Sequence, residues 1–337
     1  MRFSLKNISA RNTKILAAIT VISILSAWMK YSTSTPQKLV IHKRVAEKQS
    51  KKLVKFTFAG EILPFDSPLI LKRYRRAIAQ NRNYNIGNLD MIKAAKRWFP
   101  LIEPILRQNK IPDDFKYVAT AESKFMLSFS NKGAGGFWQM MPITARGLGL
   151  EVNEEVDERF HPIKSTEVVC KLLRQTYNMF GDWTSVALAY NMGSNAFMRL
   201  KKKHGASSVH FIRSNHETER YFFLVMASKD LIENAARYGY RVRKSGKVSE
   251  VKVVEVRETI SDLSKFAKTH HISLATLRSF NPWLRTQSLT IKPQSQNQKY
   301  LLILPVVVSS EIEELDEEYE VEPSTKNILA KDSSFSP

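Results

Sequence analysis

Residues 115–142 read FKYVATAESKFMLSFSNKGAGGFWQMMP, and this stretch decides the fold of the middle of the chain. Its first part predicts a helix over residues 111–125, in which Phe115, Val118 and Glu122 fall on one apolar stripe. An ionised carboxylate costs several kcal/mol to bury without a partner. We therefore expect Glu122 to lie on the wall of a cleft rather than inside a core.

The second part of the stretch, residues 130–142, is a glycine-rich loop that runs into aromatic, amide and thioether side chains. Glycine allows another part of the backbone to approach closely. The loop has neither the Walker spacing with its Lys-Ser/Thr pair nor a preceding strand, so it does not predict a phosphate site. A helix followed by this loop indicates a binding surface for something other than a nucleotide.

Helical signals continue on both sides of this stretch. Apolar residues at helical spacing predict further helices over residues 66–80, 90–108, 162–180, 182–190 and 217–238. Pro100 and Pro104 should break or kink the second of these. Gly181, Gly193 and Gly239 are expected to end the last three. The sequence thus predicts an all-helical unit over about residues 85–240.

The pattern changes after this unit. Residues 251–256 and 300–304 have strand-like sequences, and residues 261–268 and 273–280 indicate two short helices between them. The predicted module has the order strand, helix, helix, strand. The fold class expected for the whole chain is mainly α, with a second and smaller α+β domain.

The two ends of the chain differ from the rest. Basic residues precede an apolar run over residues 15–29, which is typical of an export signal and short for a membrane-spanning helix. No clear cleavage site follows it, so residues 1–30 are either a signal peptide or an uncleaved anchor, and residues 31–60 form a linker. The acidic and polar residues 307–337 are expected to be a disordered tail.

Composition narrows the function classes. The net charge of +20 raises the possibility of nucleic-acid binding, but the basic residues are spread along the chain without a helix-turn-helix, a zinc finger or an aromatic-rich sheet pattern. We therefore expect no nucleic-acid partner. Cys170 is the single cysteine and lies among apolar residues, so it should be a buried thiol rather than a nucleophile. The histidines show no metal-ligand spacing, and neither a metal nor a cofactor is expected.

Five motifs occur together in a characteristic order. They are Glu122-Ser123, the loop 130–142, Val156-Asp157-Glu158-Arg159, Ala189-Tyr190-Asn191-Met192-Gly193 and Glu217-Thr218-Glu219-Arg220-Tyr221. This set resembles the soluble-lytic-transglycosylase domain over about residues 60–240, and is most like the membrane-bound murein transglycosylases of type D. Residues 252–305 resemble a degenerate LysM domain, in which Arg257-Glu258-Thr259 lacks the usual Gly-Asp pair before the threonine.

The resemblance implies a lysozyme-like catalytic domain over residues 61–242 and a LysM-like domain over residues 250–306. It implies that Glu122 is the catalytic residue, and that the glycan is bound by Ser130, Gln139, Met141, Tyr190, Asn191, Glu217 and Tyr221. The expected partners are peptidoglycan glycan strands and, through the N-terminal segment, the membrane, which would place the enzyme in the cell envelope, facing the periplasm or secreted. The oligomeric state stays open.

Physical chemistry supports the role of Glu122. Cleavage of a glycosidic bond needs a proton for the leaving oxygen, and an apolar helix face favours the protonated form of a carboxyl group. Hydrolysis normally needs a second carboxylate. A transglycosylase does not, because the C6 hydroxyl of muramic acid attacks the anomeric carbon. A muramidase and a non-catalytic wall-binding protein remain the alternatives.

Several of these residues also have a purely structural interpretation. Trp138 and Met141 are favoured as core residues over sugar contacts, and Tyr190 and Asn191 could simply end a helix before Gly193. Glu217 could begin a helix, where an acidic residue suits the helix dipole. The triplet Asp157-Glu158-Arg159 is expected to be a local cluster of ion pairs.

Overall fold

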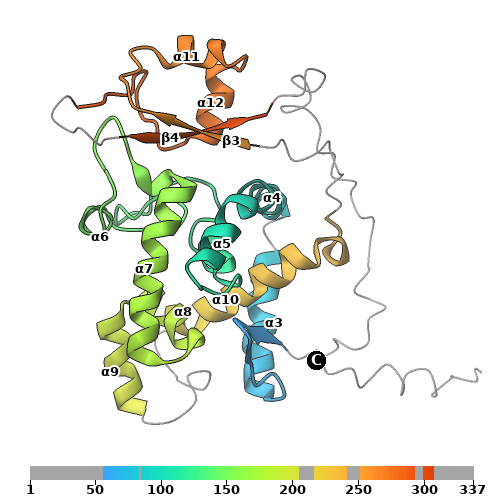
Figure 1. The fold of residues 1–337 in the computed structure, drawn as a ribbon. Helices are drawn as coiled ribbons and strands as arrows, with labels where there is room; N and C mark the ends of the chain where they lie inside the picture. Colours follow the sequence, from blue (N-terminus) through green and yellow to red (C-terminus); the bar gives the residue numbers. More distant parts are fainter. Residues whose placement is uncertain (1–55, 83–84, 205–215, 241–250, 293–298, 307–337) are drawn as a thin grey trace, which may run out of the picture. The chain divides into compact units, whose positions relative to one another are not determined.

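The computed structural model describes residues 56–82, 85–204, 216–240, 251–292 and 299–306 (Figure 1). The predicted signal or anchor (1–30), most of the predicted linker and the predicted acidic tail lie outside these residues. Within them, the structure is mainly helical with two small antiparallel sheets, so the predicted fold class is confirmed.

The described part begins with a short hairpin of β1 (Thr57–Phe58) and β2 (Glu61–Ile62), which the sequence did not predict. Ala59 and Gly60 both have positive φ, as a tight hairpin turn requires. Phe58 is fully buried against the rings of Phe115 and Phe222. Residues 57–60, which we assigned to the linker, therefore belong to the folded body, because this aromatic contact offsets the entropy of ordering them.

Helices form most of the remaining structure. They are α3 (Pro68–Arg82), α4 (Asn85–Gln108), α5 (Phe115–Ser123), α6 (Pro142–Gly147), η1 (Glu158–Phe160), α7 (Pro162–Phe180), α8 (Trp183–Met192), α9 (Ser194–His204), α10 (His216–Glu233) and η3 (Ala235–Tyr238). The predicted ends at Gly181, Gly193 and Gly239 are confirmed, and each glycine has positive φ. The last predicted helix is α-helical only to Glu233 and then becomes a short 3₁₀ turn.

Of the break or kink predicted at Pro100 and Pro104, the break is wrong, since α4 is one continuous helix through both prolines; the kink stays a prediction. Apolar residues on either side of them, including Trp98, Ile102 and Leu106, are buried in the main core. Burial along the whole length of the helix outweighs the hydrogen bonds that the prolines remove.

The main core surrounds α10, which runs beside α3, α5 and α8 (Figure 1). Consecutive residues of this helix are buried, from Tyr221 to Phe223 and from Val225 to Ala227. A helix that is apolar on all sides is typical of the centre of a helical domain. Its position brings residues of α5, α8 and α10 close together.

The predicted order of the C-terminal module is confirmed. It contains β3 (Val251–Val256), α11 (Leu263–Thr269), α12 (Leu274–Phe280) and β4 (Tyr300–Pro305), and β3 pairs antiparallel with β4 from Val251–Pro305 to Val256–Tyr300. The side chains of Asp262 and Ser273 cap the two helices. The core of the module also includes Val156 and Phe160 from the helical part of the chain.

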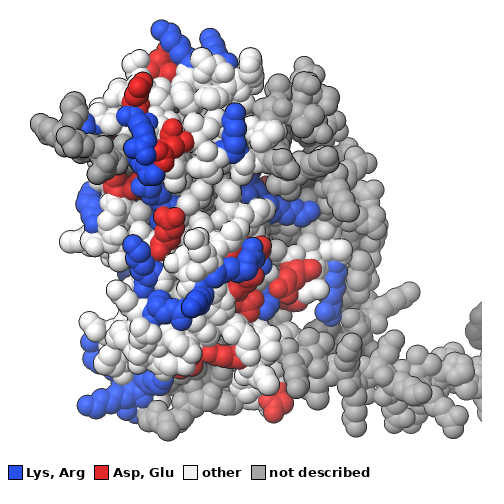
Figure 2. Space-filling view, in the orientation of Figure 1, with Lys and Arg blue, Asp and Glu red and all other residues white. Residues whose placement is uncertain are grey.

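Charged side chains of both signs share the surface. On the face seen in Figure 2, lysines and arginines are interspersed with aspartates and glutamates. Among the helices of the described residues, none has the length and apolar character needed to cross a membrane.

Candidate active site

Glu122 lies in the last turn of α5 and is half-buried. The preceding residues of its stripe, Phe115, Val118 and Ala119, are completely buried in the main core. The helix is shorter than predicted, since it begins at Phe115 and ends at Ser123. Glu122 therefore lies where the apolar helix face ends and is only partly covered by its surroundings.

The turn after Glu122 has unusual backbone geometry. Lys124, Phe125 and Leu127 all have φ between 48° and 56°, a region that costs L-residues about 1–3 kcal/mol each. Ser123 holds the turn, because its buried hydroxyl accepts a hydrogen bond from the Phe125 N–H at 3.0 Å and lies 3.0 Å from the carbonyl oxygen of Phe137. The end of α5 is thereby fixed against the glycine-rich loop.

Two tyrosines accompany Glu122, one from α8 and one from α10. Burial raises the pKa of Tyr190 well above its usual value of 10.0, and the charge of Glu122 raises it further. Burial and then Glu122 likewise raise the pKa of Tyr221. Both phenols thus stay neutral at ordinary pH, and both are close enough to Glu122 for its charge to act on them.

The two hydroxyl groups are used differently. Tyr190 donates a hydrogen bond of 2.7 Å to the carbonyl oxygen of Trp138, which ties α8 to the glycine-rich loop. The buried hydroxyl of Tyr221 makes no hydrogen bond of regular geometry in the described part of the chain, although it interacts with the Glu122 carboxyl group. The Tyr221 hydroxyl therefore interacts with Glu122, whereas the Tyr190 hydroxyl holds the loop.

The glycine-rich loop folds back on itself through backbone contacts. Gly135 bridges to both Phe129 and Met140, and Ser130 hydrogen-bonds to Ala134 through its backbone and its hydroxyl group. Gly136 has a φ of +80°, and a Cβ atom there would lie 1.9 Å from the backbone oxygen of Arg159. The close backbone approach predicted for these glycines is therefore confirmed at this position.

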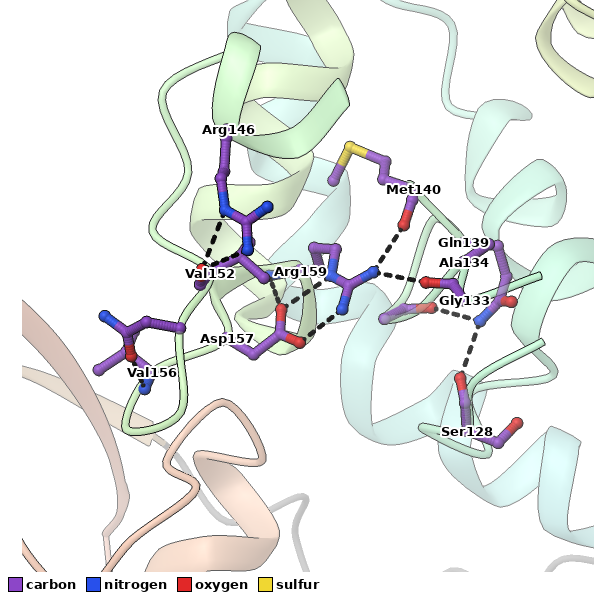
Figure 3. Close-up of polar contacts among 12 residues, drawn as sticks. Ser128, Gly133, Ala134, Gln139, Met140, Arg146, Val152, Val156, Asp157 and Arg159 are labelled. Carbon is purple, nitrogen blue, oxygen red and sulfur yellow. Dashed lines mark hydrogen bonds and ion pairs between the residues drawn. The ribbon is translucent and has the colours of Figure 1, made fainter. Parts of the chain in front are cut away.

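Arg159 holds the loop from the other side (Figure 3). Its guanidinium group donates hydrogen bonds to the backbone oxygens of Gly133 at 2.9 Å and Met140 at 3.0 Å. It also pairs with Asp157 through two contacts of 2.9 and 2.8 Å, and both side chains are buried. The predicted ion pairing is confirmed for Asp157 and Arg159, whereas Glu158 pairs with Lys164 of α7 at 3.2 Å.

The remaining predicted binding residues lie on the loop and on the end of α8. Ser130 is exposed. The amide nitrogen of Gln139 donates hydrogen bonds to the backbone oxygens of Ser128 and Gly136, and these bonds stabilise the loop (Figure 3). Met141 is 40% exposed, contrary to the core interpretation, because it precedes α6 at the loop's outer end. Asn191 is half-buried in the last turn of α8.

Glu217 belongs to the first turn of α10, and its side chain lies outside the described residues. Trp138 is fully buried and donates a hydrogen bond to Thr166, which confirms the core interpretation for this residue. Cys170 is also buried, and burial raises the pKa of its thiol to about 12. Both residues support the fold rather than the chemistry.

Sequence reasoning missed several exposed apolar side chains that flank the glycine-rich loop. Met126, Phe129 and Ile143 are 55%, 47% and 79% exposed, close in sequence to the predicted binding residues. The sequence signal that could have revealed them is the presence of apolar residues without helical spacing on both sides of the glycines. Sugar rings have apolar faces, which exposed side chains of this kind can contact. In the described part of the chain, no group of three His, Cys, Asp or Glu residues could hold a metal ion.

Comparison with known proteins agrees with this geometry. Residues 100–210 match the family described as the transglycosylase SLT domain, and residues 252–308 match the soluble lytic transglycosylase C-terminal LysM-like domain. The chain therefore contains a lysozyme-like transglycosylase SLT domain followed by a LysM-like domain.

The chain is also similar to the membrane-bound lytic murein transglycosylase D of Escherichia coli strain K12 and of Escherichia coli O6:H1 strain CFT073. It is 26% identical to each over 206 residues, which are 59% of this chain and 45% of the relative. The chain thus aligns with less than half the length of these relatives. The predicted resemblance to the type D enzymes is confirmed.

Proposed function

We propose that this protein is a peptidoglycan lytic transglycosylase. It cleaves the β-1,4 bond between N-acetylmuramic acid and N-acetylglucosamine without water, and Glu122 serves first as general acid and then as general base. The observation that carries the proposal is the position of Glu122, half-buried at the end of an apolar helix beside two neutral tyrosines, inside the segment that matches the SLT domain.

The proposed reaction begins with transfer of the Glu122 proton to the glycosidic oxygen as the bond to the anomeric carbon breaks. The C6 hydroxyl of the same muramic acid then bonds to that carbon and gives its proton to Glu122. The products are a free hydroxyl on N-acetylglucosamine and a 1,6-anhydro-N-acetylmuramic acid end. The carboxyl group is protonated again, so no water is consumed.

The proposed route uses a single carboxyl group, that of Glu122. Among the carboxyl groups of the described residues, Glu122 is the one whose charge raises the pKa of both Tyr190 and Tyr221. A hydrolase would normally place a second carboxylate opposite the acid. In our proposal Tyr190 and Tyr221 shape the surroundings of Glu122, and Ser130, Gln139, Met141, Asn191 and Glu217 help to hold the glycan.

We also propose the organisation of the chain around this centre. Residues 61–242 form the catalytic domain, and residues 250–306 form a LysM-like domain that contacts peptidoglycan. Residues 1–30 direct the protein to the cell envelope and either anchor it there or are removed. The similarity to relatives named as membrane-bound supports this location.

Replacement of Glu122 by Gln tests the catalytic assignment. The substitution keeps the size of the side chain and removes the transferable proton, so release of soluble fragments from purified cell walls should fall to background. Glu167→Gln on α7 is the matched control, because Glu167 is exposed, and it should keep normal activity. Wall cleavage by a folded Glu122→Gln variant at the rate of this control would refute the assignment.

A further inference from the structure

The segment of residues 151–161, which precedes α7, contacts the LysM-like module at several points. Val156 forms an isolated bridge with Leu284, and the Asp157 N–H donates a hydrogen bond of 3.0 Å to the carbonyl oxygen of Trp283. The Glu155 carbonyl oxygen accepts a hydrogen bond from the Arg285 N–H at 2.9 Å. The backbones of the two parts are thus paired directly.

Side chains extend this contact. The carboxylate of Glu155 accepts hydrogen bonds from the hydroxyl groups of Ser288 at 2.9 Å and Thr290 at 3.0 Å. The hydroxyl group of Tyr300 donates one of 2.8 Å to Glu151. Polar groups on both sides therefore satisfy each other, as they do inside a single domain.

His161 fixes the far end of the segment. It is buried, stacks on the ring of Trp283 at 5.2 Å between ring centres, and places Nε2 2.8 Å from the carbonyl oxygen of Leu301. Because a carbonyl oxygen only accepts, Nε2 carries the hydrogen, and Nδ1 accepts the N–H of Lys164 at the start of α7. The imidazole connects the module to α7.

The same segment also supports the loop beside Glu122. Phe160 lies in the core of the module, and its ring contacts Phe129 at 5.1 Å between ring centres. Arg285 of the module lies over the rings of Phe129 and Phe160 at 5.5 Å. Leu127, in the strained turn after Glu122, packs against both the main core and the module's core.

From these contacts we propose that the LysM-like module is a positioning element of the active site. The positioning residues are Arg285 of the module and Phe160, which belongs to η1 and packs in the module's core. The inference rests on the proposed function. A glycan-binding domain attached by a flexible linker would raise the local concentration of substrate and leave the catalytic geometry alone. This module instead packs against the segment whose Arg159 holds the glycine-rich loop, and against the turn that follows Glu122.

The proposal predicts a loss in catalytic rate even on a substrate too small to need a separate binding domain. A misplacement of active-site groups by about 1 Å can lower the reaction rate by about a hundredfold, and smaller shifts lower it less. Phe160→Leu keeps an apolar side chain but removes the ring that touches Phe129. Phe266→Leu is the matched control, because Phe266 packs on the same core and contacts His270 within the module.

The experiment uses the full chain and a soluble glycan fragment of two disaccharide units. Phe160→Leu should lower kcat by at least about tenfold with little change in KM, whereas Phe266→Leu should keep kcat. Hydrogen exchange provides a readout independent of activity, since the amides of residues 133–140 should lose protection in Phe160→Leu and keep it in Phe266→Leu. Equal kcat and equal protection in the two variants would overturn the proposal.

A second pair of variants keeps the test valid if Phe160→Leu does not fold. Arg285→Ala removes an exposed guanidinium group that lies over the Phe129 ring. The free energy of an exposed cation–π contact corresponds to about a two- to fivefold change in an equilibrium or rate constant. We expect kcat to fall by this factor in Arg285→Ala. Arg257→Ala is the control and should leave kcat unchanged, because Arg257 pairs with Glu255 inside the module. Identical kcat in both would count against the proposal. Absence of cleavage by the wild-type protein would refute the proposed function instead, and the exchange measurement would still test positioning.

Discussion

The buried pair of Asp157 and Arg159 offers the sharpest test of how the active-site loop is held. Asp157→Asn keeps the shape of the side chain but removes its charge and places an N–H₂ group where Arg159 needs an acceptor. The side chains are only 6% and 4% exposed, so the guanidinium group would stay buried without its counter-ion. Breaking a buried pair in this way costs about 3–5 kcal/mol.

That loss is a large fraction of the stability of an ordinary domain, which is about 5–15 kcal/mol. For a domain of this size it corresponds to a decrease in Tm of about 6–20 °C. Urea unfolding and thermal scans measure both quantities. Glu255→Gln is the control, because Glu255 pairs with Lys299 on the surface, and it should leave the transition unchanged. A shift for Asp157→Asn as small as that of the control would refute the structural role of the pair.

Three further predictions follow from particular residues. Gly136→Ala should destabilise the protein by more than about 2 kcal/mol because its Cβ would overlap the Arg159 backbone oxygen. Gly133 also has positive φ but has open space around the position of a Cβ atom, so Gly133→Ala should cost only about 1 kcal/mol. Equal unfolding midpoints for the two variants would contradict this prediction. Burial lowers the pKa of His161 from 6.5 to about 4. Between pH 4 and pH 6.5 the unfolded chain therefore binds a proton on this residue that the folded chain does not bind. Stability from neutral His161 is complete above pH 6.5 and declines by up to about 3 kcal/mol as the pH falls towards 4; urea unfolding of His161→Gln should lack this slope, and an unchanged slope would argue against it. Cell fractionation should find the protein in the envelope, and full-length protein in the cytosol would contradict the role assigned to residues 1–30.

The sequence predicted those elements whose signals are local. Helix ends at Gly181, Gly193 and Gly239 were readable because glycine adopts positive φ at little cost. The order of strands and helices in the C-terminal module was also predictable, because each element has its own hydrophobic period. The position of Glu122 on an apolar stripe was also a local pattern.

The sequence failed where distant contacts decide the structure. The hairpin at residues 57–62 exists because Phe58 packs on Phe115 and Phe222, and no local pattern indicates those partners. The ion pair of Asp157 and Arg159 was predicted as a local cluster, but its bonds to the glycine-rich loop join residues 19 and 26 positions apart. The paired backbones of the module and the loop segment were not predicted at all.

The products of wall digestion test the proposed reaction most directly. Purified peptidoglycan is digested with the wild-type protein, and the fragments are weighed by mass spectrometry before and after borohydride treatment. We expect muramic acid ends that are lighter by one water than hydrolytic ends and that resist reduction, because the C6 hydroxyl rather than water captures the anomeric carbon. Fragments whose muramic acid ends are all reducible would contradict this reaction, and would identify a muramidase in which Glu217 is the first residue to examine as the second carboxylate.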